Sequence, residues 1–233
     1  MRAYALAGVA MIASLFGTPI TAQDAAHWQA EREAMVDRQI VARGVADPAT
    51  LAAMRAVPRH EFVPAGKRDD AYVDFPLPIG FGATISQPYI VALMTELAQP
   101  RPWMHVLEIG TGSGYQAAVL AQIGCEVWTV EIEPALARSA LDRLTRLGYT
   151  GIAVRAGDGR LGWPEAAPFA AILVTAAAES VPPALLAQLA PGGRLVIPVD
   201  VPAGHQDLMV IEKAADGTTR ERRTIPVRFV PLR

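Results

Sequence analysis

The second half of the chain alternates short, continuous apolar runs with stretches in which apolar residues recur at helical spacing. Continuous apolar runs are typical of strands that are buried on both faces of a parallel sheet. Strands are predicted at 106–109, 127–130, 152–155, 170–174 and 194–198, and helices between them at 116–122, 135–147 and 182–189. This order of strands and helices predicts an α/β fold with a doubly wound, mostly parallel sheet.

The end of the chain has a different pattern. Strands are predicted at 208–213 and 222–230, on either side of the turn Asp216-Gly217. Such strands pair in the antiparallel sense, so an antiparallel hairpin is expected to complete the sheet. Two further turns are predicted, with Gly148 as a helix C-cap and Pro191-Gly192-Gly193 before the strand at 194–198.

The first hundred residues are predicted to be mainly helical. Residues 24–57 are amphipathic, and Asp47-Pro48 predicts the start of a helix over 49–56. Another helix is predicted at 89–98. Before it, segment 74–88 contains three prolines and two glycines, which exclude a regular helix. A shaped loop of this length inside a compact domain is usually functional.

The first 22 residues have a pattern of their own. Arg2 precedes an apolar stretch over 3–16, which small residues follow. This pattern resembles a secretory signal peptide, and the apolar stretch is too short for a stable membrane span. Residues 23–233 are therefore predicted to form a single domain. A start of translation at Met35 is the alternative, and the sequence leaves it open.

The sequence Val106-Leu107-Glu108-Ile109-Gly110-Thr111-Gly112-Ser113-Gly114-Tyr115 passes from an apolar strand through alternate glycines into a helix. Glycine permits positive φ and close approach of a ligand, and the helix N-terminus offers free N–H groups. We therefore expect this turn to bind a nucleoside cofactor. The predicted binding residues are Glu108, Gly110, Thr111, Gly112, Ser113, Gly114 and Tyr115. For Tyr115, a role as a simple core aromatic is equally compatible with the sequence.

The spacing of the turn separates two classes of cofactor. A dinucleotide fingerprint reads G-x-G-x-x-G, whereas this turn reads G-x-G-x-G. The carboxylate of Glu108 would repel a pyrophosphate but attract the cationic S-adenosylmethionine. Glu131, at the end of the strand at 127–130, is expected to accept hydrogen bonds from a ribose, and Asp158 with Gly159 to contact an adenine. The pattern favours S-adenosylmethionine over the alternative, an NAD-linked oxidoreductase.

Composition excludes several other functions. A formal net charge of −2 without a basic run argues against nucleic acid as a partner. The single cysteine, Cys125, excludes an internal disulfide. The four histidines lack the spacing of a metal site, so no metal is predicted.

Several segments resemble one family, the protein-L-isoaspartate O-methyltransferases. They are Val57-Pro58-Arg59-His60-Glu61-Phe62-Val63-Pro64, Pro76-Leu77-Pro78-Ile79-Gly80, Thr84-Ile85-Ser86-Gln87-Pro88-Tyr89, the glycine turn, Gly157-Asp158-Gly159, and residues 191–198 and 227–232. The resemblance extends from about Met35 to the end, and its stretch at 84–89 is specific to the family. It implies a Rossmann-like S-adenosylmethionine-dependent fold, with N-terminal helices and a substrate loop in 23–100 and a cofactor-binding core in 101–233.

The resemblance also implies an activity and its residues. The expected reaction is methylation of the free carboxylate of L-isoaspartyl, and of D-aspartyl, residues in damaged peptides and proteins. Ser86 matches the family's active-site serine; the alternative is a helix N-cap. The expected substrate-binding residues are Thr84, Ile85, Ser86, Gln87, Pro88 and Thr175. The family implies a cytoplasmic monomer, whereas the leader at 1–22 suggests export.

The chain departs from the family pattern at Ala83, where glutamine is common, and at Ala170, where aspartate is common. The first change affects the substrate loop, and the second removes a charge at the start of a strand. Export through the leader would separate the protein from its supply of cofactor. An alternative function is an S-adenosylmethionine-binding protein of the same fold that has a different acceptor or no turnover.

Overall fold

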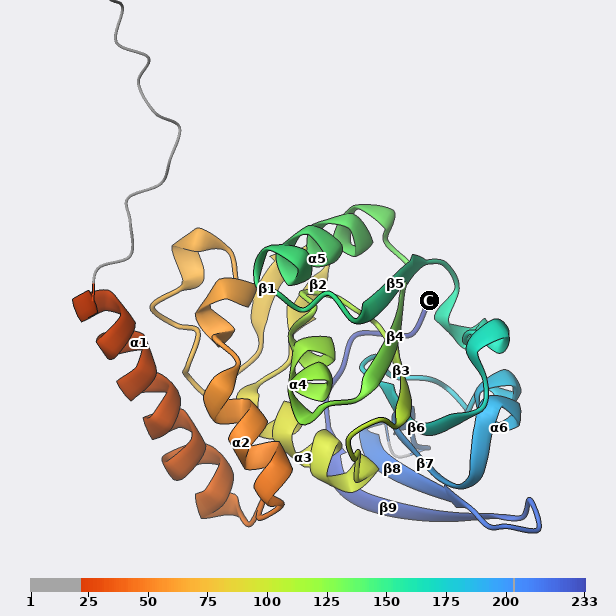
Figure 1. The fold of residues 1–233 in the computed structure, drawn as a ribbon. Coiled ribbons are helices and arrows are strands. Elements are labelled where there is room, and N and C mark those ends of the chain that lie inside the picture. The colour runs from red at the N-terminus through yellow and green to blue at the C-terminus, as the bar shows by residue number, and fades with distance from the viewer. Residues whose placement is uncertain (1–21, 203) are drawn as a thin grey trace, which may run out of the picture.

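The computed structural model describes residues 22–202 and 204–233. Almost all of the predicted leader thus lies outside the described residues. The core is a seven-stranded sheet in the order β5-β4-β3-β6-β7-β8-β9 (Figure 1). Its strands are β3 (His105–Ile109), β4 (Glu126–Glu131), β5 (Ile152–Ala156), β6 (Phe169–Val174), β7 (Leu189–Asp200), β8 (Gln206–Lys213) and β9 (Thr219–Val227).

The sheet has a parallel and an antiparallel part. Strands β5, β4, β3, β6 and β7 pair in parallel with their neighbours. Strand β8 pairs antiparallel with β7, and β9 pairs antiparallel with β8. The predicted doubly wound sheet with a C-terminal hairpin is therefore confirmed.

Helices cover both faces of this sheet. They are α1 (Ala22–Met35), α2 (Pro48–Ala56), α3 (Pro88–Ala98), α4 (Tyr115–Ile123), α5 (Pro134–Arg146) and α6 (Pro183–Gln188). Alternate residues of β6 enter two separate cores: Leu173 packs with residues of α2, α3 and α4, and Ile172 packs with Leu185 of α6. Burial on both faces explains why β6 is a continuous apolar run. No helix among the described residues is long and apolar enough to cross a membrane.

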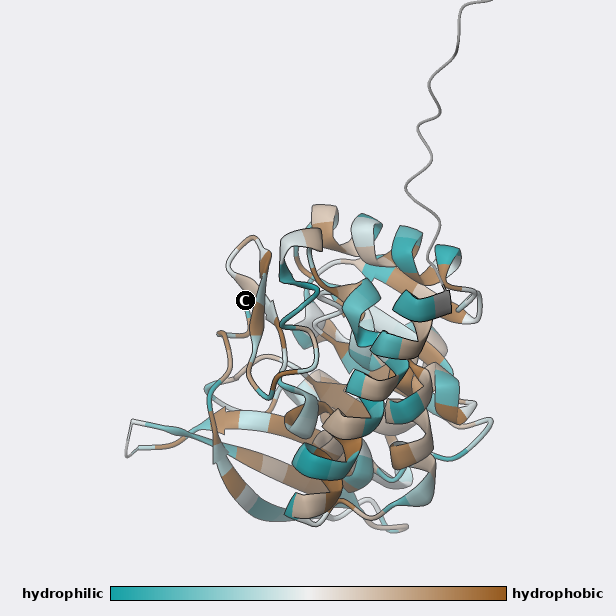
Figure 2. Ribbon diagram, turned by 90° about the vertical axis from the view of Figure 1, so that its left-hand side faces the viewer, coloured by the Kyte–Doolittle hydropathy of each residue, from teal (hydrophilic) through white to brown (hydrophobic). Residues whose placement is uncertain are grey.

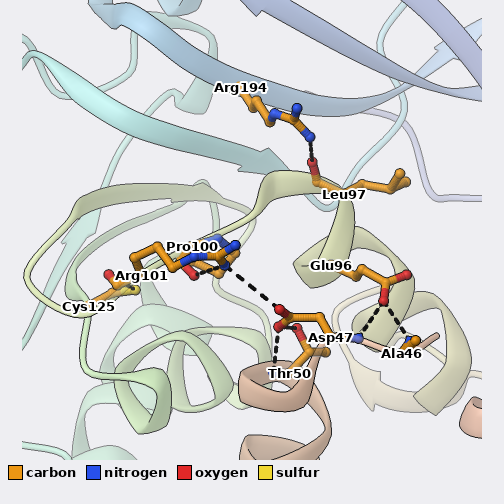
Figure 3. A network of polar contacts seen from close by, with 9 residues as sticks. All are labelled: Ala46, Asp47, Thr50, Glu96, Leu97, Pro100, Arg101, Cys125 and Arg194. Atoms are coloured by element: carbon orange, nitrogen blue, oxygen red, sulfur yellow. Dashed lines mark hydrogen bonds and ion pairs between the residues drawn. The ribbon is translucent and has the colours of Figure 1, made fainter.

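The N-terminal helices are joined to the core by polar contacts. After α1 the chain continues through a π-helical turn (Val36–Ile40) and a 3₁₀ turn (Val41–Arg43). Asp47 caps α2 by accepting from the backbone N–H of Thr50 at 2.8 Å. Glu96 of α3 accepts from the N–H groups of Ala46 and Asp47, each at 2.7 Å (Figure 3). The helices nearest the viewer in Figure 2 alternate hydrophobic and hydrophilic residues, as expected for elements with one buried face.

The predicted loop at 74–88 contains a small hairpin that the sequence analysis did not anticipate. Strands β1 (Leu77–Gly80) and β2 (Ala83–Ile85) pair antiparallel, with Leu77 opposite Ile85. The tip residues Gly80, Phe81 and Gly82 all have positive φ, between 53° and 96°. Glycine accommodates this conformation readily, which explains the two glycines in the segment.

The predicted turn at Pro191-Gly192-Gly193 is wrong in one respect, because these residues lie within β7. The pairing of β7 with β6 shifts register there, between Phe169 and Ala171, so the segment is an irregularity of the strand. A Cβ on Gly193 would lie 2.8 Å from the carbonyl oxygen of Ala190 and 3.0 Å from that of Ala170. Glycine is therefore required by the close approach of backbone.

Candidate active site

A cavity of about 280 Å³ lies at the carboxyl ends of β3, β4 and β6. In open α/β sheets this edge is where ligands bind. Its walls come from the β1–β2 hairpin, the three strand ends, Gly159 and the end of the chain, which lies at this edge of the sheet (Figure 1). We call it the strand-end cavity.

Two glycines that line this cavity are packed tightly against neighbouring strand ends. Gly110 has φ +96°, and a Cβ there would lie 2.4 Å from the Thr175 hydroxyl oxygen. That hydroxyl donates to the carbonyl oxygens of Gly110 at 2.8 Å and Ile109 at 3.0 Å. A Cβ on Gly159 would lie 2.3 Å from Cγ2 of Ile109. Both positions therefore exclude any side chain, because the neighbouring strand ends occupy the space.

Glu131 ends β4 and lines the strand-end cavity, as its predicted role requires. Its Oε2 accepts from the N–H of Gly112 at 2.7 Å, and its Oε1 accepts from the N–H of Glu133 at 3.1 Å. These bonds fix the carboxylate. Each carboxylate oxygen has a second acceptor site, so the group can still accept from a ligand hydroxyl.

Glu108 lies beneath the glycine turn, in a different position from Glu131. It is fully buried, and burial raises the pKa of its carboxyl group to about 8. The Thr129 hydroxyl donates to its Oε2 at 2.6 Å, whereas its Oε1 has no hydrogen-bond partner in the described part of the chain. Glu108 lines a small cavity of about 30 Å³ together with Gln116, whose Oε1 is also without a partner there. Two such acceptors suit a cationic or strongly donating ligand group.

The other predicted cofactor residues divide into two groups. Gly112 lines the strand-end cavity and the small cavity, and Thr111 and Ser113 line the small cavity. Gly114 forms the N-cap of α4 with φ +84°. The carboxylate of Asp158 does not line the strand-end cavity; it accepts from the backbone and guanidinium of Arg160.

Tyr115 is placed in the core. Its side chain is 1% exposed, and its ring packs edge-on against Phe62 with a centroid distance of 5.4 Å. It lines the small cavity but not the strand-end cavity. Of the two alternatives for Tyr115, the position is that of a core aromatic.

A larger groove of about 860 Å³ adjoins the strand-end cavity. Thr84, Ser86, Gln87 and Thr175 line it, and Thr84 and Thr175 line the strand-end cavity as well. The N-cap of α3 is Gln87, with no side-chain cap, so the Ser86 hydroxyl does not serve as the cap. The other two predicted substrate residues, Ile85 and Pro88, are buried, and Pro88 is the first residue of α3.

Sequence reasoning missed one wall of this groove, at Arg43. Its guanidinium forms an ion pair with Asp74 and lies 3.6 Å above the ring centroid of Tyr89. Asp74 also accepts from the backbone N–H of Tyr89 at 3.2 Å and the Gln87 amide at 3.4 Å. The aspartate thus ties the start of α3 to the N-terminal helices. Arg43 and Asp74 are far apart in sequence, and no local pattern signals their contact.

The C-terminal segment 225–231 forms the opposite wall of the groove, and residues 230–233 also line the strand-end cavity. The segment is held against the end of β6 by Ala177, which donates to the carbonyl of Val230 at 2.8 Å and accepts from the N–H of Leu232 at 2.7 Å. Its only signal in the sequence is the family resemblance at 227–232, to which the sequence analysis assigned no site role.

Comparisons with known proteins agree with this architecture. Residues 30–233 match the family model "Protein-L-isoaspartate(D-aspartate) O-methyltransferase (PCMT)". Protein-L-isoaspartate O-methyltransferase 1 of Cupriavidus necator is 52% identical, with 96% of this chain and 90% of the relative covered. The Picosynechococcus protein-L-isoaspartate O-methyltransferase is 58% identical, with 86% of this chain and 89% of the relative covered.

Solved structures give the same result. A protein-L-isoaspartate O-methyltransferase superposes with a TM-score of 0.78 at 30% identity, covering 86% of this chain and 65% of that longer chain. A beta-aspartate methyltransferase (PCMT) from Plasmodium falciparum, in complex with S-adenosyl-L-homocysteine, has a TM-score of 0.76 at 24% identity, covering 87% and 98%, and shows the shared fold. The chain therefore belongs to the protein-L-isoaspartate (D-aspartate) O-methyltransferase family.

Proposed function

We propose that this protein transfers a methyl group from S-adenosylmethionine to the free carboxylate of L-isoaspartyl, and of D-aspartyl, residues in damaged peptides and proteins. One observation carries the proposal beyond family membership: Thr84 and Thr175 line both the strand-end cavity and the groove. A nucleoside in the cavity and a peptide in the groove would therefore meet at one shared wall.

The residues present fit the cofactor. Gly110 and Gly112 have positive φ and line the strand-end cavity without a side chain, so a nucleoside can approach their backbone closely. Glu131 would accept from the ribose hydroxyls at the end of β4. Glu108 and Gln116 provide two buried acceptors without partners among the described residues, which suit the cationic part of S-adenosylmethionine. When bound, this cofactor supplies a methyl group on a positively charged sulfur.

The protein's own task in this reaction is orientation. A carboxylate with a pKa near 4 is already ionised at neutral pH, so no general base is needed. The groove would hold the peptide so that one carboxylate oxygen faces the strand-end cavity, which replaces a bimolecular encounter by a fixed geometry. The Ser86 hydroxyl would donate a hydrogen bond to that carboxylate, and Thr84 and Thr175 would border it.

The experiment uses the full chain, methyl-labelled S-adenosylmethionine and two peptides that differ only in isoaspartate or aspartate at one site. We expect base-labile label, the mark of a methyl ester, on the isoaspartyl peptide alone. Label on both peptides would contradict the selectivity. Cofactor binding without transfer would instead support the alternative, a binding protein of this fold.

We also infer that the protein works as a monomer in the cytoplasm. The described residues of one chain line both the strand-end cavity and the groove, which supports the monomer, and membership of this family supports the cytoplasm. Sedimentation would test the monomer. Cell fractionation with N-terminal sequencing would test the compartment, since loss of residues 1–22 and recovery outside the cytoplasm would overturn it.

A further inference from the structure

Arg59 lies directly beneath the segment that carries Ser86. It opens the 3₁₀ turn Arg59–Phe62, and its side chain is fully buried. Its Nε donates to the carbonyl of Ala71, and its Nη2 donates to the carbonyl of Ser86, both at 2.7 Å. These carbonyls lie on either side of the β1–β2 hairpin. One guanidinium thus joins the two ends of the segment that carries Thr84 and Ser86.

Among the described residues, no acidic side chain forms an ion pair with Arg59. None of the ion pairs among the described residues includes it, and its Nη1 lacks a hydrogen-bond partner there. Asp74 acts on it through space, but that carboxylate is paired with Arg43. Burial lowers the pKa of Arg59 to about 10, so it stays cationic at neutral pH. Its guanidinium carbon lies 4.8 Å from the ring centroid of Tyr115.

A buried, unpaired cation is expensive to maintain, and two carbonyls alone would be satisfied by neutral donors. The position of this cation therefore suggests a role in the groove beside it. The cation is one hydrogen bond from the backbone of Ser86, and Ser86 lines the groove. Charges act strongly across a poorly solvated interior, so this side of the cleft favours an anionic group.

We propose that Arg59 is a positioning residue that fixes the Ser86 backbone and, through its charge, selects an anionic carboxylate over a neutral acceptor in the groove. This inference rests on the proposed function, because it concerns the same groove. It assigns two separable roles to one side chain. The planar fork holds two carbonyls at once, and the charge acts on the substrate.

Two variants separate these roles. Arg59→Lys keeps the charge but loses the planar fork that reaches two carbonyls. Arg59→Gln keeps a donor but removes the charge. Arg194→Lys is the matched control, since Arg194 also donates to a backbone carbonyl, that of Leu97 at 3.3 Å (Figure 3), and neither residue lines the groove.

Two readouts are compared in wild type and variants. The first is kcat and KM for methylation of an isoaspartyl peptide. The second is the ratio of dissociation constants for that peptide and its neutral α-carboxamide analogue, measured with S-adenosylhomocysteine present. We expect Arg59→Lys to lower kcat about tenfold while keeping the ratio, because alignment suffers and charge does not. We expect Arg59→Gln to reduce the preference for the carboxylate about tenfold. Arg194→Lys should change neither.

Each role has a result that overturns it. If Arg59→Gln keeps the wild-type preference for the carboxylate, the charge of Arg59 does not select the substrate. If Arg59→Lys keeps the wild-type kcat, the two hydrogen bonds of Arg59 do not position Ser86. If Arg59→Gln does not fold, Arg59→Lys still tests whether the hydrogen bonds of Arg59 position Ser86. Equal binding of both peptides by the wild type would then refute the selection of a carboxylate by charge. If wild type methylates no isoaspartyl peptide, the proposed function fails. Hydrogen exchange then still tests whether Arg59 holds the two ends of this segment. If it does, the backbone amides of residues 72–87 exchange faster in Arg59→Lys than in the wild type.

Discussion

The two walls of the cleft are built in different ways. On the side of the sheet, the cofactor wall is formed by parallel strand ends packed so closely that Gly110 meets Thr175 and Gly159 meets Ile109. The substrate wall consists of a short hairpin and the C-terminal segment. These are held by a small number of hydrogen bonds and one ion pair, made by Arg59, Asp74 and Ala177.

The packed wall has a fixed shape, whereas the hydrogen-bonded wall can adapt its shape to a ligand. A wall fixed by close packing tolerates no added atom, because interiors are packed as densely as crystals. A wall fixed by a few hydrogen bonds loses about 0.5–1.5 kcal/mol for each bond removed and can shift without unfolding. A single cofactor suits the first kind of wall, whereas peptides of varied sequence suit the second.

The largest expected effect is on the packed wall. Gly110→Ala would place a methyl group 2.4 Å from the Thr175 hydroxyl at φ +96°. We expect a loss of about 2–4 kcal/mol in the free energy of unfolding, together with loss of cofactor binding. Gly80→Ala is the matched control, because Gly80 also has φ +96° but nothing within 4 Å of the added Cβ. It should cost about 1–2 kcal/mol from backbone strain alone. If urea denaturation shows the same loss in the free energy of unfolding for both variants, the close packing at Gly110 contributes nothing to stability.

The second effect concerns the shared wall. Ser86→Ala should lower kcat for an isoaspartyl peptide by roughly tenfold to a hundredfold, because one oriented donor to the carboxylate is lost. Cofactor affinity, measured by calorimetry, should stay within about twofold, because Ser86 lines the groove and the small cavity but not the strand-end cavity, where the nucleoside would bind. The exposed Ser180→Ala serves as a control. Loss of cofactor binding in Ser86→Ala would make Ser86 a scaffold residue.

The third effect is a pH dependence on the cofactor side. Burial raises the pKa of Glu108 from 4.5 to about 8, so folding favours the protonated form. Its contribution to stability is complete below pH 4.5 and is lost as the pH rises to about 8. Glu108→Gln should therefore flatten the pH dependence of Tm across this window. A bound cation should favour the ionised form of Glu108 over the protonated form. The affinity for S-adenosylmethionine should therefore rise with pH in the wild type and not in Glu108→Gln.

The smallest effect is expected on the substrate wall. Asp74→Asn weakens the bonds to Arg43, Gln87 and the N–H of Tyr89. We expect KM for the peptide to rise about threefold to tenfold, with a change of less than about 1 kcal/mol in stability, because exposed ion pairs contribute little. Asp216→Asn, in a remote exposed turn, is the control. An unchanged KM would show that the groove does not depend on this anchor.

The packed wall is also the part that the sequence predicts. Parallel strands appear as continuous apolar runs, and positive φ or close approach requires glycine at Gly110 and Gly159, so both features are local. The register irregularity in β7 was missed, because the Pro191-Gly192-Gly193 pattern is equally typical of a free turn.

The substrate wall escaped prediction because its contacts join distant segments. Arg43 meets Asp74 only after the N-terminal helices have packed, and Val230 meets Ala177 only after the sheet is complete. Arginine is usually exposed, so the residue type alone would predict a surface position for Arg59, which is buried. Asp158 pairs locally with Arg160, and the spacing of the sequence did not reveal this contact.

The C-terminal segment has a consequence for synthesis on the ribosome. Residues 230–233 follow every strand of the sheet in the chain, and they line the strand-end cavity. A nascent chain therefore carries all of its glycine turn long before the cavity has its last wall. Domains generally form from the N-terminus as the chain emerges, so ligand binding can stabilise only a chain whose sheet is already finished. Synthesis as far as residues 230–233 is thus a condition for the complete cavity.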